Sequence, residues 1–266
     1  CQDPHRILRA GVFFDGTNNN RYRDEPKQEH TNVVRLDHIY RDVDTAEEVH
    51  RKLYVLGVGS MDEEERQRQA EREREAVADR NFLVRWGTAV SSRASQMVDT
   101  GENIAGMAGG HGGRDRLNTA YFWLKDRCLE VPTPAMKTVD IFGFSRGAAI
   151  ARTFVNLVNM ALRKTEPNIT VRFLGVYDTV GSFGMAGDDS EPGQNLYVDG
   201  TDAQGMAHFT ARHEYRQNFP LTVITGIDKE YAGAHSDVGG SYAPKDKDNR
   251  VNHLAYVPLR DMYGEG

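Results

Sequence analysis

One serine lies in a sequence pattern that is typical of nucleophilic catalysis. Ser145 is the centre of the pentapeptide Gly-Phe-Ser-Arg-Gly, which follows an apolar run at 139–144 and precedes apolar residues at helical spacing. A Gly-x-Ser-x-Gly sequence between a strand and a helix indicates a nucleophile elbow, a tight turn that exposes the serine hydroxyl. The same pentapeptide also occurs by chance in glycine-rich turns, but the flanking strand and helix favour catalysis. We therefore predict that Ser145 is a nucleophile.

A serine nucleophile needs a histidine that takes its proton and an acid that orients the histidine. In chains with this elbow, the three groups follow the order serine, acid, histidine. Asp178 comes directly after an apolar run at 171–177, and His235 lies near glycines beyond a later apolar run. We predict that Asp178 is the acid and His235 the base. Other residues of the same types stay open as alternatives: His213 as the base, and Asp199, Asp202 or Asp237 as the acid.

Acyl transfer also requires N–H groups that stabilise the negatively charged oxygen of the tetrahedral intermediate. The backbone N–H of Arg146, directly after the nucleophile, is one expected donor to this oxyanion hole. The second donor normally comes from a loop after an early strand, and the turn at Gly16 and Thr17 is the best-placed candidate. The guanidinium of Arg146 can bind a phosphate group or pair with a carboxylate of the scaffold, and the sequence leaves both open.

The same turn partly matches a different class of enzyme. Haloacid dehalogenase-type phosphotransferases begin with Asp-x-Asp-Gly-Thr after a strand, and Asp15, Gly16 and Thr17 match its second half. The nucleophilic aspartate of that pattern is replaced here by Phe13, so this reaction is disfavoured. The spacing of acidic residues and histidines gives no specific support for a metal site, and we expect neither a metal nor another cofactor.

The elements that must position these residues alternate between strands and helices. Strands are expected where apolar, β-branched and aromatic residues cluster, at 7–14, 53–58, 139–144, 171–177 and 221–227. Helices are expected at 31–40, 115–129, 150–162 and 206–217, the first of them capped by Thr31. This alternation predicts an α/β fold with a mostly parallel sheet and helices on both faces. Such sheets bind ligands at the carboxyl ends of their strands, where the Asp15 turn and Ser145 both fall.

Three stretches interrupt this alternation within a single expected domain at 1–266. Residues 61–80 carry many charges and no apolar stripe, which predicts a solvated or partly disordered insertion at about 60–85. A lid or a membrane-surface element is the functional alternative for this insertion. The glycine-rich residues 101–113 lack the spacing of a nucleotide site, so we expect a mobile loop near the site entrance. Residues 183–205 are expected to form a long loop.

Composition excludes several classes of protein. The formal net charge of −6 argues against a nucleic-acid partner held through its phosphates. The two cysteines, Cys1 and Cys128, form neither a disulfide framework nor a zinc-binding pattern. No apolar run approaches the roughly 20 residues that span a bilayer, and no signal-peptide pattern is present. We expect that one or both ends of a longer protein are missing, because the chain begins without Met and stops soon after a helix start.

Four stretches of the chain together resemble one known family. They are VFFDGTNN at 12–19, GFSRGA at 143–148, FLGVYDTVGS at 173–182 and HSDVGG at 235–240. In this order they are similar to the α/β-hydrolase domain of the type VI secretion phospholipase effectors, the first lipase-effector family. The resemblance spans nearly the whole chain. The charged insertion departs from the family pattern, and we expect the membrane-binding region that often follows in the family to belong to the missing C-terminal part.

This resemblance implies an α/β-hydrolase-like fold and a serine esterase of phospholipase A type, which cleaves acyl chains from glycerophospholipids at a membrane surface. By motif, Ser145 would be the nucleophile, Asp178 the acid and His235 the base. The resemblance further implies an antibacterial toxin, made in the bacterial cytoplasm and delivered to the periplasm of target cells. Its expected partners are secretion spike proteins and a cognate immunity protein. The alternatives are a soluble carboxylesterase with no membrane role and a non-catalytic binding module on the same fold.

Overall fold

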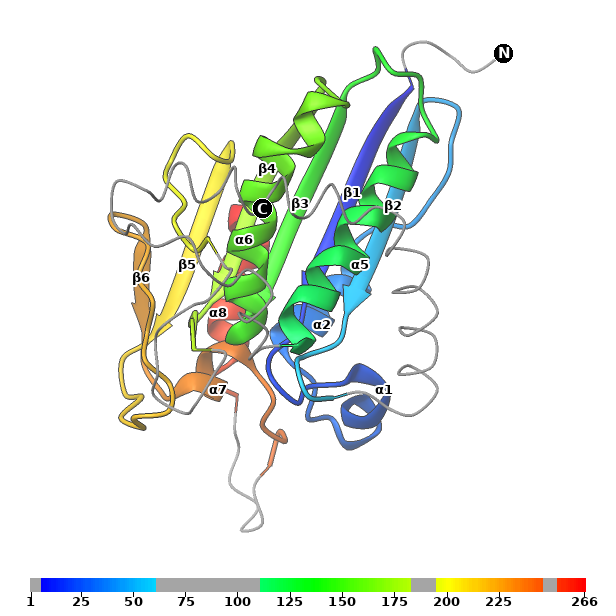
Figure 1. Cartoon of the computed structure of the whole chain (residues 1–266). Coiled ribbons are helices and arrows are strands. Elements are labelled where there is room, and N and C mark those ends of the chain that lie inside the picture. Colours follow the sequence, from blue (N-terminus) through cyan, green and yellow to red (C-terminus); the bar gives the residue numbers. More distant parts are fainter. Residues whose placement is uncertain (1–5, 61–110, 183–194, 246–252) are drawn as a thin grey trace.

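The computed structural model describes residues 6–60, 111–182, 195–245 and 253–266. In these ranges, six strands form one sheet in the order β2-β1-β3-β4-β5-β6, and every neighbouring pair is parallel. The strands are β1 (Ile7–Phe14), β2 (Glu48–Val55), β3 (Lys137–Phe144), β4 (Ile169–Tyr177), β5 (Gly205–Ala211) and β6 (Asp228–Tyr231). Because all six run the same way, their carboxyl ends meet at one edge of the sheet, as Figure 1 shows.

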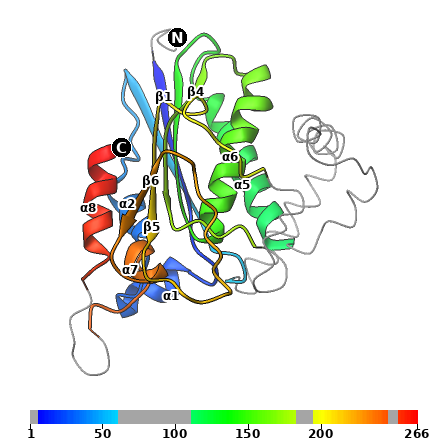
Figure 2. The ribbon, with the colours of Figure 1, turned by 90° about the vertical axis from the view of Figure 1, so that its left-hand side faces the viewer.

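Helices cover both faces of this sheet. On one face, α5 (His111–Cys128) packs against β1 and β2, and α6 (Arg146–Met160) packs against β3 and β4, with Leu124 and Phe154 fully buried. On the other face, α2 (Asn32–Ile39) and α8 (Tyr256–Glu265) bury Val33 and Met262. Figure 2 shows the sheet edge-on between the two helical layers. The predicted architecture, a mostly parallel sheet between helices, is confirmed.

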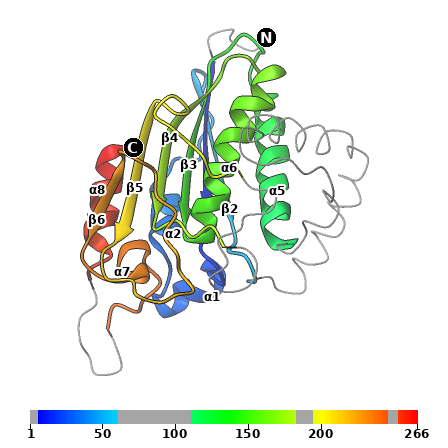
Figure 3. The same ribbon diagram turned by 60° about the vertical axis from the view of Figure 1, so that its left-hand side comes forward.

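Short elements gather at the carboxyl edge of the sheet. They are α1 (Arg21–Asp24), the 3₁₀ turn η1 (Glu25–Lys27) and α7 (His235–Gly239), while a second 3₁₀ turn, η3 (Leu162–Lys164), follows α6. Figure 3 shows α1 and α7 at this edge, below the ends of the strands. Thr31 caps α2 as predicted, because its hydroxyl accepts a hydrogen bond from the N–H of Val34 at 3.3 Å.

The predicted strands at 7–14, 139–144 and 171–177 are confirmed as β1, β3 and β4, and the predicted helix at 115–129 corresponds to α5. The strand expected at 53–58 begins earlier and ends earlier, as β2. Its extent follows β1, with which it pairs residue by residue from Ile7↔Glu48 to Phe14↔Val55. As an edge strand, β2 tolerates the polar side chains that hid its beginning in the sequence.

Two predicted elements are wrong. Residues 206–217, expected to be helical, contain strand β5, whose backbone pairs with β4 on one side and β6 on the other. These long-range pairings override a weak local preference for helix. Residues 221–227, expected to be a strand, lie outside the sheet. The carbonyls of Thr222 and Val223 accept hydrogen bonds from the buried guanidinium of Arg152, which also donates to the carbonyl of Leu196.

The charged insertion lies outside the described residues. So do most of the expected loops at 101–113 and 183–205. Of the first loop, residues 111–113 belong to the beginning of α5 rather than to a loop. Of the second, residues 195–204 form neither helix nor strand. In the parts of the chain that the structure describes, no helix combines the length and apolar character needed to cross a bilayer.

Candidate active site

Ser145 occupies a strained turn between β3 and α6. Its backbone has φ 58° and ψ −125°, a conformation that non-glycine residues rarely adopt. Four backbone hydrogen bonds hold this turn. The N–H of Ser145 donates to the carbonyl of Tyr177 at 3.0 Å, and its carbonyl accepts from Ala148 at 3.0 Å, Val180 at 3.2 Å and Ala149 at 3.3 Å. The elbow geometry expected from the pentapeptide is therefore present, tied to the ends of β4 and α6.

Gly147, two residues after Ser145, is required by a close approach of two backbones. A Cβ atom on Gly147 would lie 2.3 Å from the carbonyl oxygen of Asp15 and 2.4 Å from that of Phe14. Only glycine lets the first turn of α6 pack this closely against the end of β1. This contact brings the Asp15 turn and the nucleophile elbow together, as the sequence predicted from their positions at strand ends.

Asp178 and His235, far apart in the sequence, form a buried pair. Nδ1 of His235 lies 2.6 Å from Oδ2 of Asp178, and only 4 % and 3 % of the two residues' surfaces are exposed. Oδ1 of Asp178 accepts a hydrogen bond from the N–H of Ala211 at 2.8 Å, while its own N–H donates to the carbonyl of Phe209 at 2.7 Å. The carboxylate is thus anchored to the end of β5. The backbone of Asp178 itself has a positive φ of 40°.

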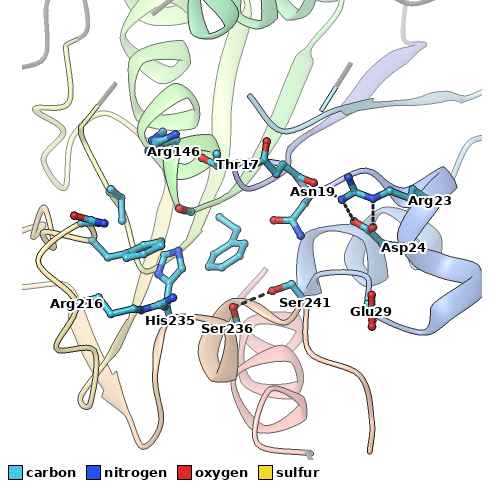
Figure 4. Close-up of a pocket in the computed structure, with 16 residues that line it drawn as sticks. Thr17, Asn19, Arg23, Asp24, Glu29, Arg146, Arg216, His235, Ser236 and Ser241 are labelled. Atoms are coloured by element: carbon cyan, nitrogen blue, oxygen red, sulfur yellow. Dashed lines mark hydrogen bonds and ion pairs between the residues drawn. The ribbon is translucent and has the colours of Figure 1, made fainter. Parts of the chain in front are cut away.

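Aromatic side chains fix the orientation of the imidazole. The ring of His235, the first residue of α7, lies between Phe144 and Phe219, with centroid distances of 4.5 and 4.8 Å. Ser145 and His235 both line one cavity of about 540 Å³, drawn in Figure 4. No hydrogen bond joins the two side chains within the described part of the chain. Catalytic hydrogen bonds often tighten only when substrate binds.

The oxyanion-hole prediction needs one correction. The N–H of Gly16 donates to Oδ1 of Asp15 at 2.8 Å, so it is already engaged and does not point to a substrate. The N–H groups of Thr17 and Arg146 have no hydrogen-bond partner among the described residues, and both residues line the cavity. For Arg146 this follows from its place as the first residue of α6, where N–H groups lack an intrahelical acceptor.

Asp15 is the buried acid that shapes this turn. Its carboxylate accepts hydrogen bonds from Gly16, from the hydroxyl of Thr31 at 2.7 Å, and from the hydroxyl of Tyr54. Burial raises the pKa of Asp15 to about 6, although the three hydrogen bonds act in the opposite direction. Asp15 itself does not line the cavity, so its position indicates a structural role in holding the turn at Thr17.

The alternative acids and base are engaged elsewhere. Nδ1 of His213 accepts a hydrogen bond from the N–H of Gly233 at 3.1 Å, and this histidine lies on the surface. Asp237 caps α7 by accepting from the N–H of Ala234 at 2.8 Å. Asp199 and Asp202 hold the loop between them through a hydrogen bond of 2.9 Å. None of these side chains is among the described residues that line the cavity.

A second buried histidine–aspartate pair was not predicted from the sequence. His208 on β5 is fully buried, with Nδ1 2.7 Å from Oδ1 of Asp228 and Nε2 3.2 Å from the N–H of Thr179. Because Nε2 accepts from this N–H, the proton is assigned to Nδ1, which donates to Asp228. Burial lowers the pKa of His208, which keeps the ring neutral. His208 thereby fixes the backbone of Thr179, the residue directly after Asp178. In the sequence, the apolar run around His208 was the only sign that this histidine is buried.

The part of the chain that the structure describes contains no group of three or more His, Cys, Asp or Glu side chains arranged to hold an ion.

A family model described as "T6SS, Phospholipase effector Tle1-like, catalytic domain" matches residues 9–162 and 159–265. The chain belongs to this family. A comparison with curated proteins gave no match. Among solved structures, the chain is similar to one described as "Structure of the Tle1 effector bound to the VgrG spike from the Type 6 secretion system", with 24% identity and a TM-score of 0.54 over 89% of this chain.

A second solved structure, described as an uncharacterized protein from Pseudomonas aeruginosa, is 21% identical with a TM-score of 0.59 over 98% of this chain. At these identities, the two structures show that the fold is shared. The chain spans about half of each, 51% of the Tle1 effector and 46% of the second protein.

Proposed function

We propose that this chain is a single catalytic domain, a serine esterase that hydrolyses acyl ester bonds of glycerophospholipids, in the manner of a phospholipase A. The observation that carries the proposal is the buried His235–Asp178 pair at 2.6 Å, whose histidine lines the same cavity as a serine on a nucleophile elbow. Membership of the phospholipase effector family supports the substrate class.

In the first half of the proposed reaction, Nε2 of His235 takes the proton of Ser145 Oγ while Oγ attacks the ester carbonyl carbon. The N–H groups of Arg146 and Thr17 stabilise the resulting oxyanion. When the tetrahedral intermediate collapses, the bond to the glycerol oxygen breaks, and His235 donates its proton to that oxygen. A lysophospholipid leaves, and the acyl chain stays on Ser145.

In the second half, His235 takes a proton from water, and the hydroxide oxygen attacks the acyl-enzyme. Collapse releases a fatty acid, and the proton returns to Ser145. Asp178 acts throughout through His235. It accepts a hydrogen bond from the Nδ1–H group, which keeps the proton on Nδ1 and leaves Nε2 free as a base, and it stabilises the imidazolium that forms in each half.

The proposal extends to the biological setting through the family. The solved Tle1 effector is described as bound to the VgrG spike. For this protein we propose a spike protein as carrier, a cognate immunity protein as inhibitor, and the periplasm of a target cell as destination.

A fluorophosphonate probe tests the catalytic proposal most directly. The probe is expected to label the wild type at Ser145, shown by mass mapping of the adduct, and not to label Ser145→Ala. The same variant is expected to release fatty acid from phosphatidylglycerol vesicles with a kcat lower by roughly 10³–10⁶. Far-ultraviolet circular dichroism serves as the control for folding.

Two outcomes would favour other functions. Absence of labelling in the wild type would indicate a non-catalytic binding module. Labelling with equal turnover of a dissolved short-chain ester and of vesicle lipid, without a gain at the interface, would indicate a soluble carboxylesterase. Normal phospholipid turnover by Ser145→Ala would refute the assignment of the nucleophile.

A further inference from the structure

Among the described residues, one arginine of the cavity has no acidic partner for its charge. Three arginines line it, and two of them form ion pairs, Arg23 with Asp24 at 2.7 Å and Arg216 with Glu214 at 2.6 Å. The guanidinium of Arg146 forms no ion pair with any carboxylate in the described ranges. The open alternative from the sequence, that Arg146 pairs with an acid of the scaffold, therefore has no support.

Two polar atoms of the cavity wall are buried without a partner. Nε of Arg146 and the hydroxyl oxygen of Thr17 are both shielded from solvent, and neither has a hydrogen bond within the described residues. Figure 4 shows both residues on the same side of the cavity, across from Ser236 and Ser241. Buried polar groups in native proteins are nearly always paired, so an unpaired set at a cavity wall points to a ligand.

Charge and desolvation agree with this interpretation. Burial lowers the pKa of Arg146, and no acidic neighbour acts in the opposite direction. Since a guanidinium keeps its proton in proteins, Arg146 presents a partly desolvated positive charge with free donors. An anionic group with several acceptor oxygens satisfies this requirement best, and a phosphate accepts two parallel hydrogen bonds from a guanidinium.

We propose that the side chains of Arg146 and Thr17 bind the phosphodiester of the glycerophospholipid whose ester Ser145 attacks. This inference rests on the proposed function and names the group that the cavity recognises. In a glycerophospholipid, the phosphate and the nearer acyl ester are attached to neighbouring carbons of glycerol. Ser145 and Arg146 are likewise neighbours, so one backbone step separates the nucleophile from the cation. Arg146 then distinguishes phospholipids from neutral glycerides.

The test compares phosphatidylglycerol with diacylglycerol of the same acyl chains in identical mixed micelles. Arg146→Gln keeps the backbone N–H and removes the charge. Its preference for phospholipid, as the ratio of the two kcat/KM values, is expected to fall at least 10-fold, because hydrogen bonds to charged groups are worth roughly 10- to 100-fold in binding. This loss of preference is expected mainly as a higher KM for phosphatidylglycerol. Arg146→Lys should lie between, since it keeps the charge but loses the planar fork.

The matched control is Arg212→Gln. Arg212 is exposed, pairs with Glu230 at 3.1 Å and does not line the cavity, so its removal is expected to leave the preference unchanged. A second variant, Thr17→Val, should lower the preference by a smaller factor. It keeps the inference testable if Arg146→Gln does not fold.

A second measurement separates a lipid headgroup from free phosphate. Inorganic phosphate is added to the wild type and to Arg146→Lys during hydrolysis of a dissolved neutral ester. Weaker inhibition of the variant, together with the loss of phospholipid preference, supports the inference. If inhibition depends on Arg146 but the lipid preference does not, the site binds free phosphate and the headgroup assignment is overturned.

Equal losses on phospholipid and diacylglycerol would also overturn the inference, because they would indicate a role in folding or in the oxyanion hole. Failure of the wild type to hydrolyse either lipid would instead refute the proposed function. The two failures are therefore distinguishable.

Discussion

Replacing the buried Asp15 with asparagine should stabilise the protein at neutral pH. At pH 7 the carboxylate of Asp15 is ionised although only 2 % of the residue is exposed, and burial has raised its pKa from 3.8 to about 6. Since each tenfold change in proton affinity corresponds to about 1.4 kcal/mol, the buried charge costs about 3 kcal/mol at neutral pH. Asparagine carries no charge and has nearly the same shape.

The hydrogen bonds at this position allow the exchange. Gly16 and Thr31 both donate to the same oxygen, Oδ1, which asparagine keeps. The hydroxyl of Tyr54 donates to Oδ2, and it can rotate to accept a hydrogen bond from the asparagine amide instead. The substitution therefore removes a desolvated charge but leaves the hydroxyl hydrogen of Tyr54 without its carboxylate acceptor, so about 3 kcal/mol is its upper limit.

The pH dependence provides the assay. The folded state has the higher pKa, so it binds more protons than the unfolded state between pH 3.8 and about 6, and the wild type loses stability as the pH rises through this window. Urea unfolding of both proteins is followed by fluorescence at several pH values. The advantage of Asp15→Asn is expected to grow by about 2 kcal/mol between pH 4.5 and 7.5.

A companion variant, Thr31→Val, should lower the stability of the protein where Asp15→Asn raises it. Thr31→Val removes a hydrogen bond that stabilises the ionised form of Asp15, so its stability deficit should be larger at pH 7.5 than at pH 4.5. If the wild type and Asp15→Asn gave parallel stability curves across this range, the reasoning on the buried charge would be refuted.

Three further substitutions test the rest of the site. Gly147→Ala should lower the free energy of unfolding by about 1–3 kcal/mol in urea titrations, because the added Cβ meets two carbonyl oxygens, and unchanged stability would contradict this. His208→Leu should lower the free energy of unfolding by about 2–4 kcal/mol, because the N–H of Thr179 loses its acceptor. The wild type should become less stable below about pH 6.5, because the imidazole of His208 is protonated in the unfolded state but stays neutral when buried, and this decline should be absent in the variant. Asp178→Asn should reduce kcat by about 10³–10⁴ with the fold retained, because His235 then carries the wrong tautomer; an active variant would exclude Asp178 as the acid.

The nucleophile strand and helix could be predicted because their sequences are locally consistent. An apolar run, glycines at the turn and a helical apolar face all agree around Ser145. Asp178 and His235 were singled out by their positions at strand ends and by the known order of such groups, and the structure brings the two side chains within hydrogen-bond distance. These inferences needed only short-range patterns and one topological rule.

The parts that were missed depend on long-range pairing. Strand β5 has no clear alternation and becomes a strand because β4 and β6 pair with it on both sides. Strand β6 reads Asp-Lys-Glu-Tyr, an exposed edge whose charges hide it in any hydrophobicity pattern. The donor role expected for Gly16 failed because its N–H bonds to the side chain of the preceding residue, a detail of turn geometry that residue order does not contain.

The way in which Arg152 holds its neighbourhood has a consequence for how such an enzyme can diversify. Its guanidinium binds the main-chain carbonyls of Leu196, Thr222 and Val223, and every amino acid type supplies a carbonyl. The hydrogen bonds that anchor the two connecting segments to α6 therefore do not depend on which side chains these residues carry. Because the second segment begins just after Phe219 of the cavity wall, substitutions near it can change the edge of the cavity while the hydrogen bonds to Arg152 are kept.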